Sequence, residues 1–410
     1  MTQTLFLNAT IIDCSQTEAR SGNVLIENGR IVDTNASSST QVIGQTIDLR
    51  GATLMPGLID CHVHVVASTM DLTANAQLPD ALAMLRSLPI MKGMLERGFT
   101  TVRDVGGAPY SLAQGIEEGH IVAPRLVVCG KALSRTGGHA DNRPRHDIYD
   151  AKRWARNYGA LGRVADGVEE VRFACRETLR EGASFIKIMA NGGVSSPTDP
   201  VAAQGYSTEE ILTAVQEARD NGTYVSAHLY MPDAIERAVR AGVHSLEHCN
   251  NIDAPTARLA AAAGAVAVPT LVTYEALAND GARFGLPPVS IAKVADVRTR
   301  GMESLSIMQD AGLTMAFGTD LLGDAHDRQN EEFAIRARVL PSFDILASAT
   351  TVAAALIGMK DKLGVVKEGA LADLLVINGN PAEDVSVLAD RRNINLVMKE
   401  GSIFKNTISY

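Results

Sequence analysis

Two histidines one residue apart are the first feature of this sequence that could do chemistry. His62 and His64 lie near the end of the segment LMPGLIDCHVHV, in which Pro56-Gly57 breaks the chain just before the short apolar run Leu58-Ile59. That run predicts a buried strand. Because alternate residues of a strand point the same way, both imidazoles would share a face and could hold one metal ion together.

Four further residues of metal-ligand type lie at the ends of later strand-like runs. The runs are FIKIM, SAHLY, SLEHC and FGTD, and the residues are Lys187, His228, His248 and Asp320. Imidazole and carboxylate donors suit zinc, although manganese, cobalt or iron could use them too. The apolar surroundings of Lys187 would lower the pKa of its ammonium group, and a neutral amine can add carbon dioxide. The resulting carbamate could bridge two cations with its two oxygens.

The ordered set of motifs, from PGLIDCHVH to FGTD, resembles the amidohydrolase superfamily of metal-dependent hydrolases over nearly the whole chain. The resemblance implies two divalent metal ions, with zinc favoured. His62, His64 and Asp320 would hold one ion, His228 and His248 the second, and carbamylated Lys187 both. A hydroxide bridging the metals would be the nucleophile, because bound cations lower the pKa of water to about neutrality. Asp320 would take its proton and deliver it to the leaving amine.

Three other residues are candidates for contact with the substrate. His139 lies in the loop segment RTGGHAD, and Tyr230 follows His228 by two residues. Both could polarise a substrate carbonyl oxygen as negative charge develops on it, although Tyr230 could equally be a packed aromatic at a loop edge. His326, in GDAHDRQNEEF, could reach the substrate or brace Asp320.

Further motifs narrow the resemblance to one branch of the superfamily. The spacing HLY, the loop motif GGH and the segment NGGVSSPTDPVAAQGYS look like the metal-dependent carboxypeptidases, Xaa-Pro dipeptidases and ochratoxinase-like amidases. In that branch the histidine and the tyrosine contact the carbonyl or carboxylate of the substrate. The expected activity is release of a C-terminal amino acid from dipeptides, including Xaa-Pro, or from N-acyl amino acids such as ochratoxin-like amides. Hydrolysis of a cyclic amide, lactam or ester at the same site is the alternative, and a non-catalytic scaffold of this fold is a remote one.

Several other polar residues are expected to be structural. Arg103 and Asp104 are predicted to pair at a strand end, and His244 to be structural. Ser195 and Ser196 are not taken as nucleophiles, because no GxSxG elbow is present. The five cysteines show no CxxC spacing and are expected to be reduced and mostly buried.

A repeated strand and helix pattern between Leu58 and about Met359 would position the ligands. After the first strand, the candidates are Thr100–Val105, Arg125–Cys129, Phe185–Met189, Tyr224–His228, Ser245–His248, Ala265–Val268 and Thr314–Gly318. Eight alternating units predict an α/β fold, a (β/α)8 barrel of the TIM type, whose chemistry lies at the C-terminal strand ends where every proposed ligand falls. A doubly wound sheet would need a GxGxxG after an early strand, and none follows. Two long loops, Gly130 to about Val164 and Ala190 to Tyr206, would overhang the metals.

Both ends of the chain consist of short β-like runs separated by turn signals. They are most economically explained as one small β-sandwich domain built from the two termini. The predicted domains are therefore residues 1–56 with 361–410, forming the sandwich, and residues 57–360, forming the barrel.

Composition excludes several classes of partner. With 46% hydrophobic and 21% charged residues, the 410-residue chain is typical of a globular protein. A net charge of −9 and the absence of a basic patch argue against nucleic acid. No run approaches the length of a membrane span, and no signal peptide is recognisable. We therefore expect a cytoplasmic enzyme of small amide or dipeptide substrates, and the resemblance implies a homo-oligomer.

Overall fold

The structure is a computed structural model that describes residues 3–148, 150–196, 199–283 and 288–408. The chain forms two compact units. The first consists of Met1–Asp60, Lys92–Val102 and Asn330–Tyr410, and the second of Cys61–Met91 and Arg103–Gln329. Both ends of the chain thus belong to the first unit, and each unit is described by itself.

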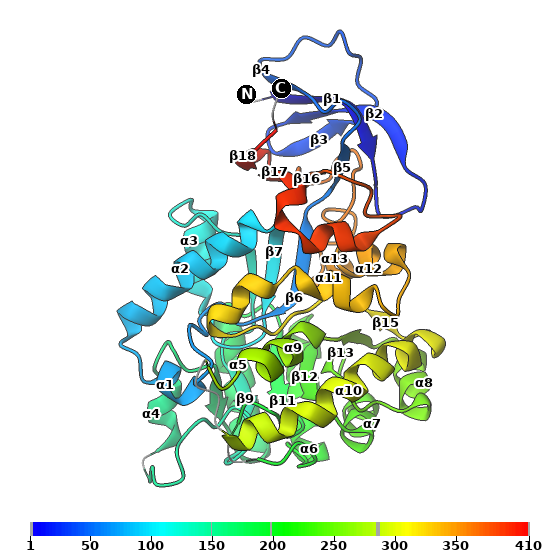
Figure 1. Cartoon of the computed structure of the whole chain (residues 1–410). Coiled ribbons are helices and arrows are strands. Elements are labelled where there is room, and N and C mark those ends of the chain that lie inside the picture. Colours follow the sequence, from blue (N-terminus) through cyan, green and yellow to red (C-terminus); the bar gives the residue numbers. More distant parts are fainter. Residues whose placement is uncertain (1–2, 149, 197–198, 284–287, 409–410) are drawn as a thin grey trace. The chain divides into compact units, whose positions relative to one another are not determined.

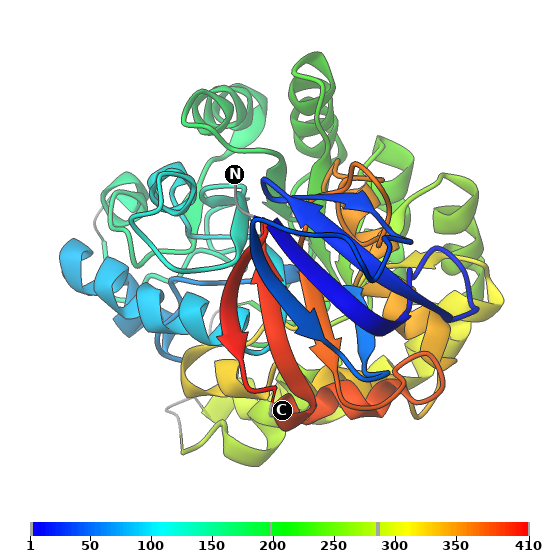
Figure 2. The same ribbon diagram turned by 90° about the horizontal axis from the view of Figure 1, so that it is seen from above.

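An eight-stranded sheet joins the two ends of the chain in the first unit, as the blue and red strands of Figure 2 show. Its order is β18-β17-β16-β5-β1-β2-β3, with β4 paired to β1. One face covers a core that includes Phe6, Ile11, Leu374 and Leu396. The strands are β1 Gln3–Ile11, β2 Arg20–Glu27, β3 Arg30–Asp33, β4 Gly44–Asp48, β5 Thr53–Pro56, β16 Leu374–Ile377, β17 Ile394–Lys399 and β18 Ser402–Asn406.

Two further sheets lie in the α/β part of the chain (Figure 1). One has the order β10-β9-β11-β12-β13-β14-β15 with every pair parallel, and the other has the order β6-β7-β8. The strands are β6 Leu58–Val63, β7 Phe99–Asp104, β8 Arg125–Val128, β9 Ala132–Ser134, β10 Gly162–Val164, β11 Ile186–Met189, β12 Val225–Leu229, β13 Ser245–His248, β14 Val266–Val268 and β15 Thr314–Met315. Each of the eight predicted runs overlaps one of these strands, whereas β9 and β10 lie inside a predicted loop.

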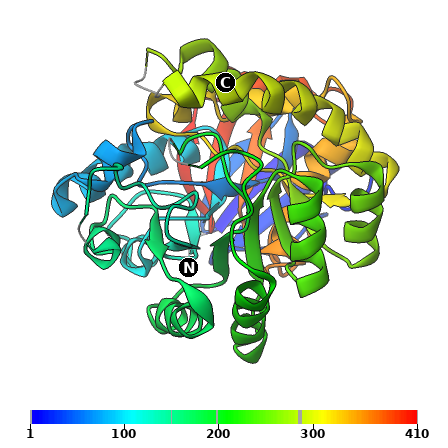
Figure 3. The same cartoon turned by 90° about the horizontal axis from the view of Figure 1, so that it is seen from below.

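Helices separate the strands, and Figure 3 shows the green helices of residues 167–262 on the outer side of their sheet. Local signals explain where some of them begin. Ser207 and Glu210 form a capping box at the start of α6, and Pro232 begins α7, whose buried side includes Ile235 and Val239. The helices are α1 Leu72–Ala76, α2 Asp80–Glu96, α3 Tyr110–Glu117, α4 Ala151–Ala155, α5 Gly167–Arg180, α6 Thr208–Asp220, α7 Pro232–Ala241, α8 Ala254–Ala262, α9 Leu271–Asp280, α10 Pro288–Asp310, α11 Glu331–Arg336, α12 Ser342–Ser348 and α13 Thr351–Leu356, with 3-10 turns η1 Gly323–Arg328, η2 Val385–Ala389 and η3 Arg391–Asn393.

None of the helices among the described residues is both long enough and apolar enough to cross a membrane.

Candidate metal centre and substrate cavity

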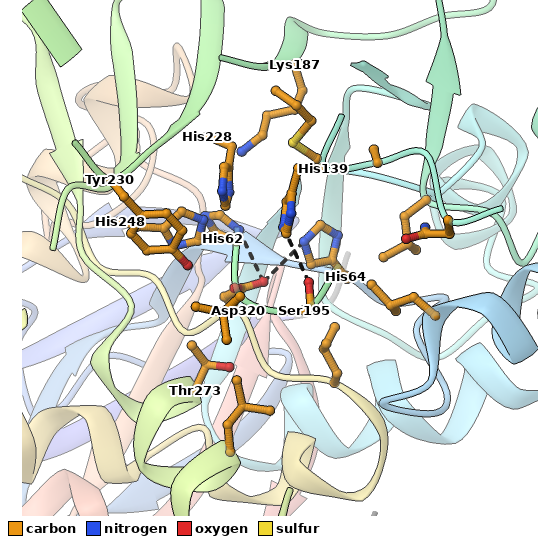
Figure 4. A pocket seen from close by; sticks show the side chains of 18 of the residues that line it. His62, His64, His139, Lys187, Ser195, His228, Tyr230, His248, Thr273 and Asp320 are labelled. Atoms are coloured by element: carbon orange, nitrogen blue, oxygen red, sulfur yellow. Dashed lines mark hydrogen bonds and ion pairs between the residues drawn. The ribbon is translucent and has the colours of Figure 1, made fainter. Parts of the chain in front are cut away.

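All six residues predicted to bind metal line one cavity of the second unit (Figure 4). Each comes from a strand or from the residues just after one. They are His62 and His64 at the end of β6, Lys187 on β11, His228 on β12, His248 at the end of β13 and Asp320 after β15. Parallel strands end at the same edge of a sheet, which explains how residues so far apart in sequence meet.

The donor atoms of three of these residues lie close enough to share an ion. Ligand atoms of His62, His248 and Asp320 are all within 4.8 Å of one another. Oδ1 of Asp320 lies 3.4 Å from Nε2 of His62 and 3.2 Å from Nε2 of His64, as the dashed lines of Figure 4 mark. This cluster of imidazole and carboxylate donors suits a divalent cation such as zinc.

Each of the four histidines uses one ring nitrogen to contact the surrounding protein. For His62, His64 and His248 this atom is Nδ1, which lies 2.8 Å from the carboxylate of Glu247, 2.9 Å from the carbonyl of Gly106 and 2.8 Å from the hydroxyl of Thr270, respectively. For His228 it is Nε2, 3.1 Å from the carbonyl of Gly192. Such contacts fix the ring and leave the other nitrogen for an ion. The residues present therefore fit a metal centre.

Glu247 is the buried anion beneath this cluster. Its Oε1 accepts hydrogen bonds from Arg103 at 2.8 Å and from the hydroxyls of Ser226 and Ser245, both at 2.6 Å. The predicted pair of Arg103 with Asp104 is wrong, because the guanidinium of Arg103 pairs with Glu247 instead. Asp104 instead accepts backbone N–H groups of residues 65, 106 and 108.

Burial and neighbouring charges lower the pKa values of two central groups, Lys187 and Asp320. Burial lowers the pKa of Lys187, which is 1% exposed, and Glu247 only partly opposes that effect. Burial alone would raise the pKa of Asp320, but His62 and His64 hold it well below its usual range. The amine is thus biased towards its neutral form and the carboxylate towards its anion.

The backbone is strained where two of the proposed ligands lie. His248, Cys249 and Asp320 have φ angles of 69°, 57° and 54°, in the left-handed region that side chains rarely adopt. Strained residues of this kind gather at functional sites, where the surrounding structure holds them in place.

His139 enters the cavity from the first of the two predicted loops and packs against a proposed ligand. Its ring stacks on that of His228 with centroids 4.2 Å apart. Nε2 lies 3.3 Å from Oγ of Ser195, and Nδ1 lies 3.5 Å from a carboxylate oxygen of Asp199, both from the second loop. Both loops therefore contribute to the cavity wall, as predicted, with residues 197–198 of the second lying outside the described residues.

Tyr230 also lines the cavity rather than packing at a loop edge. Its ring stacks on His248 with centroids 5.3 Å apart, and its hydroxyl lies 2.7 Å from the hydroxyl of Tyr274 on α9. In Figure 4 the ring of Tyr230 lies beside that of His248.

His326 is the one predicted site residue that the structure does not bring to the cavity wall. It lies in η1, buried, with Nε2 3.1 Å from the carbonyl oxygen of Ala67. Its predicted contact with the substrate remains without support from this geometry.

Comparison with known proteins identifies the family. The sequence profile of the amidohydrolase family matches residues 53–404. The chain belongs to the amidohydrolase family.

Relatives within the amidohydrolases include proteins of known activity. Ochratoxinase from Aspergillus niger is 33% identical over 364 residues, which cover 86% of this chain and 75% of that protein. A crystal structure of a prolidase complexed with N-methylphosphonate-L-proline is 50% identical with a TM-score of 0.97, covering 99% of this chain and 100% of that one. A Xaa-Pro dipeptidase with methionine bound in its active site is 29% identical with a TM-score of 0.87, at 99% and 100% coverage. The chain is an amide or peptide hydrolase that acts on C–N bonds.

Sequence reasoning missed three residues around this amidohydrolase site. Glu247, Thr270 and Tyr274 each contact a predicted residue, namely His62, His248 and Tyr230. Glu247 stands next to His248 in SLEHC, so its position at a ligand-bearing strand end was a signal that could have found it. Nothing local marks Tyr274, whose partner lies 44 residues away.

Proposed function

We propose that the protein is a binuclear metal-dependent hydrolase that releases a C-terminal amino acid from dipeptides, including Xaa-Pro, or from N-acyl amino acids. The observation that carries this proposal is the single cavity that holds six ligand-type residues together with His139 and Tyr230. The 50% identical prolidase supports the substrate class, because its ligand carries L-proline next to a tetrahedral phosphorus in place of an amide carbon.

In this proposal the ligands divide between two ions as the family resemblance implies. His62, His64 and Asp320 would hold one ion, preferably zinc, and His228 and His248 would hold the second. When bound, the two cations act as Lewis acids and lower the pKa of water.

Asp320 acts as the proton carrier. Its carboxylate, held as an anion by the neighbouring imidazoles, accepts the proton of the attacking water and delivers it to the nitrogen of the leaving amino acid. Its backbone is fixed by a hydrogen bond of 2.8 Å from its own N–H to the carbonyl of His62. This hydrogen bond helps to place the carboxylate beside the ring of His62, 3.4 Å from its Nε2.

His139 and Tyr230 bind the polar groups of the substrate. Both face the cavity and both have rings held by stacking on a neighbouring histidine. We assign them to the carbonyl oxygen, where negative charge develops, and to the C-terminal carboxylate.

Lys187 would carry the carbamate that contacts both ions. Its lowered pKa favours the neutral amine that reacts with carbon dioxide. A Lys187→Ala variant should lose activity and metal, and added acetate or formate should partly restore both by supplying the missing carboxylate. Full activity of this variant without added acid would contradict the assignment.

The closure of the barrel and the division into domains are also proposals. We infer that β6, β7, β8 and β11–β15 close into a (β/α)8 barrel. The N–H of Cys61 on β6 donates to the carbonyl of Phe317 after β15 at 2.8 Å, and the N–H of Ser184 before β11 donates to Val128 on β8 at 2.8 Å. The terminal sandwich domain, 1–56 with 361–410, and the barrel domain, 57–360, remain proposals, as do the cytoplasmic location and the homo-oligomer.

The deciding experiment is turnover of N-acyl amino acids and Xaa-Pro dipeptides by zinc-reconstituted protein, beside the same compounds as C-terminal amides. Cleavage restricted to free carboxylates supports the proposal. If neither set is cleaved while two metals are bound, the proposal fails, and lactams and esters become the substrates to measure.

A further inference from the structure

A row of four buried polar side chains leads from a proposed metal ligand to the substrate cavity. Nδ1 of His248 lies 2.8 Å from the hydroxyl of Thr270, and the hydroxyl of Tyr274 lies 2.7 Å from that of Tyr230. Thr270 is the N-cap residue of α9, and Tyr274 lies four residues later, one helical turn along the same face. All four residues are at most 2% exposed, so water does not compete for these contacts.

The chemistry of each group determines which side chain donates each hydrogen bond along the row. A histidine that offers Nε2 to a cation carries its proton on Nδ1, so His248 must donate to the oxygen of Thr270. A hydroxyl has one proton to donate, and the side-chain hydrogen bond between Thr270 and Tyr274 would use that of Thr270. Tyr274 in turn donates to the oxygen of Tyr230.

We propose that Thr270 and Tyr274 are positioning residues that make Tyr230 present its hydroxyl proton to the substrate. Because the oxygen of Tyr230 is already occupied by Tyr274, its own proton is free to point into the cavity. In the opposite order, Tyr230 would donate its proton to Tyr274. The lone pairs of the Tyr230 oxygen would then face the substrate oxygen, and the two oxygens would repel each other. This inference rests on the proposed function in two assignments, that of Nε2 of His248 to a cation and that of Tyr230 to a substrate oxygen.

The test compares hydroxyl deletions along the row in the zinc-loaded protein. The variants are Tyr230→Phe, Tyr274→Phe, their double variant, Thr270→Val and Thr270→Ser. Tyr206→Phe is the matched control, because the hydroxyl of Tyr206 is also buried but donates to the carbonyl of Ala165 at 2.9 Å, outside the cavity wall. The readouts are kcat/KM, the Kd of N-methylphosphonate-L-proline by calorimetry, and the zinc content.

We expect Tyr230→Phe and Tyr274→Phe each to weaken probe binding and kcat/KM by about tenfold, the effect of one hydrogen bond. Because both act through one proton, the double variant should lose no more than Tyr230→Phe alone. Thr270→Ser should behave as the parent protein and Thr270→Val as Tyr274→Phe, while Tyr206→Phe keeps the parent affinity. Parent-like binding by Tyr274→Phe, or losses that add in the double variant, would overturn the inference.

Failure of the proposed function can be told apart from failure of this inference. If the parent protein cleaves no amide of an amino acid, the proposed function fails. The same variants are then measured on the lactam or ester that the parent does cleave, and additivity between Tyr230→Phe and Tyr274→Phe again decides whether the two hydroxyls act as one.

Discussion

At the residue scale, Glu247 holds two different parts of the site with its two oxygens. Oε2 contacts Nδ1 of His62 at 2.8 Å, and Oε1 contacts Arg103 at 2.8 Å. Burial alone would raise the pKa of Glu247, but Arg103 holds it well below its usual range. Removing this anion would leave the guanidinium of Arg103 buried without a counter-charge, which costs more than the pair itself contributes.

A Glu247→Gln variant should therefore lose both stability and metal. We expect the free energy of unfolding to fall by roughly 3–5 kcal/mol, the usual cost of breaking a buried pair, and metal affinity to fall by about 10–100-fold. Denaturant unfolding and metal titration measure the two effects.

Glu177→Gln is the matched control for that variant. Glu177 pairs with Arg163 at a partly exposed position, where such a pair contributes about 1 kcal/mol or less. Equal losses in the two variants would show that the buried network has no special role.

At the scale of elements, the loop after β11 is pressed against His139. A Cβ added to Gly193 would lie 2.0 Å from Cε1 of the His139 ring, so only glycine fits there. The loop cannot easily move away, because Nζ of Lys293 on α10 donates to the carbonyls of Gly193, Ser196 and Asp199 at 2.9, 2.8 and 2.6 Å. The position of His139 thus depends on α10 through this loop.

Gly193→Ala should displace His139 and lower kcat/KM by about 100-fold, the loss that a misplacement near 1 Å can cause. Metal content should stay unchanged, because the three atoms nearest to the added Cβ all belong to the ring of His139 and none to a proposed ligand. The steady-state kinetics are compared with those of Gly115→Ala on α3, where a Cβ would meet only the flexible side chain of Ile121. Unaltered kinetics in Gly193→Ala would remove His139 from the proposed mechanism.

The elements were easier to predict than the contacts between them. Each ligand stands within or just after a short apolar run, and such runs mark strands from local sequence alone. Three of the partners of Glu247 lie 185, 144 and 21 residues away, so no local pattern could reveal these contacts. His326 follows Asp320 closely in sequence, yet η1 directs it to the carbonyl of Ala67. The long loop from Gly130 hid β9 and β10 because each has only three residues.

At the scale of the whole chain, the proposed ligands span residues 62 to 320, so bound metal would join distant segments. Ligands that bind only the folded state stabilise it by mass action, by about 4 kcal/mol at a thousandfold excess over Kd. Chelation should therefore lower the midpoint of thermal unfolding and abolish turnover, and added zinc should restore both. An unfolding midpoint that is identical with and without chelator would contradict a metal held between these segments.

The five cysteines, all free and buried, give the native chain its own reporters of opening. Cys14 belongs to the first unit, whereas Cys61 and Cys249 flank proposed ligands in the second. A thiol reagent cannot reach any of them until the surrounding segment opens, and burial raises the pKa of Cys249, which slows its reaction further. Mass spectrometry would show the order in which these thiols become labelled. That order tells whether the two units open together or separately, and no engineered label is needed.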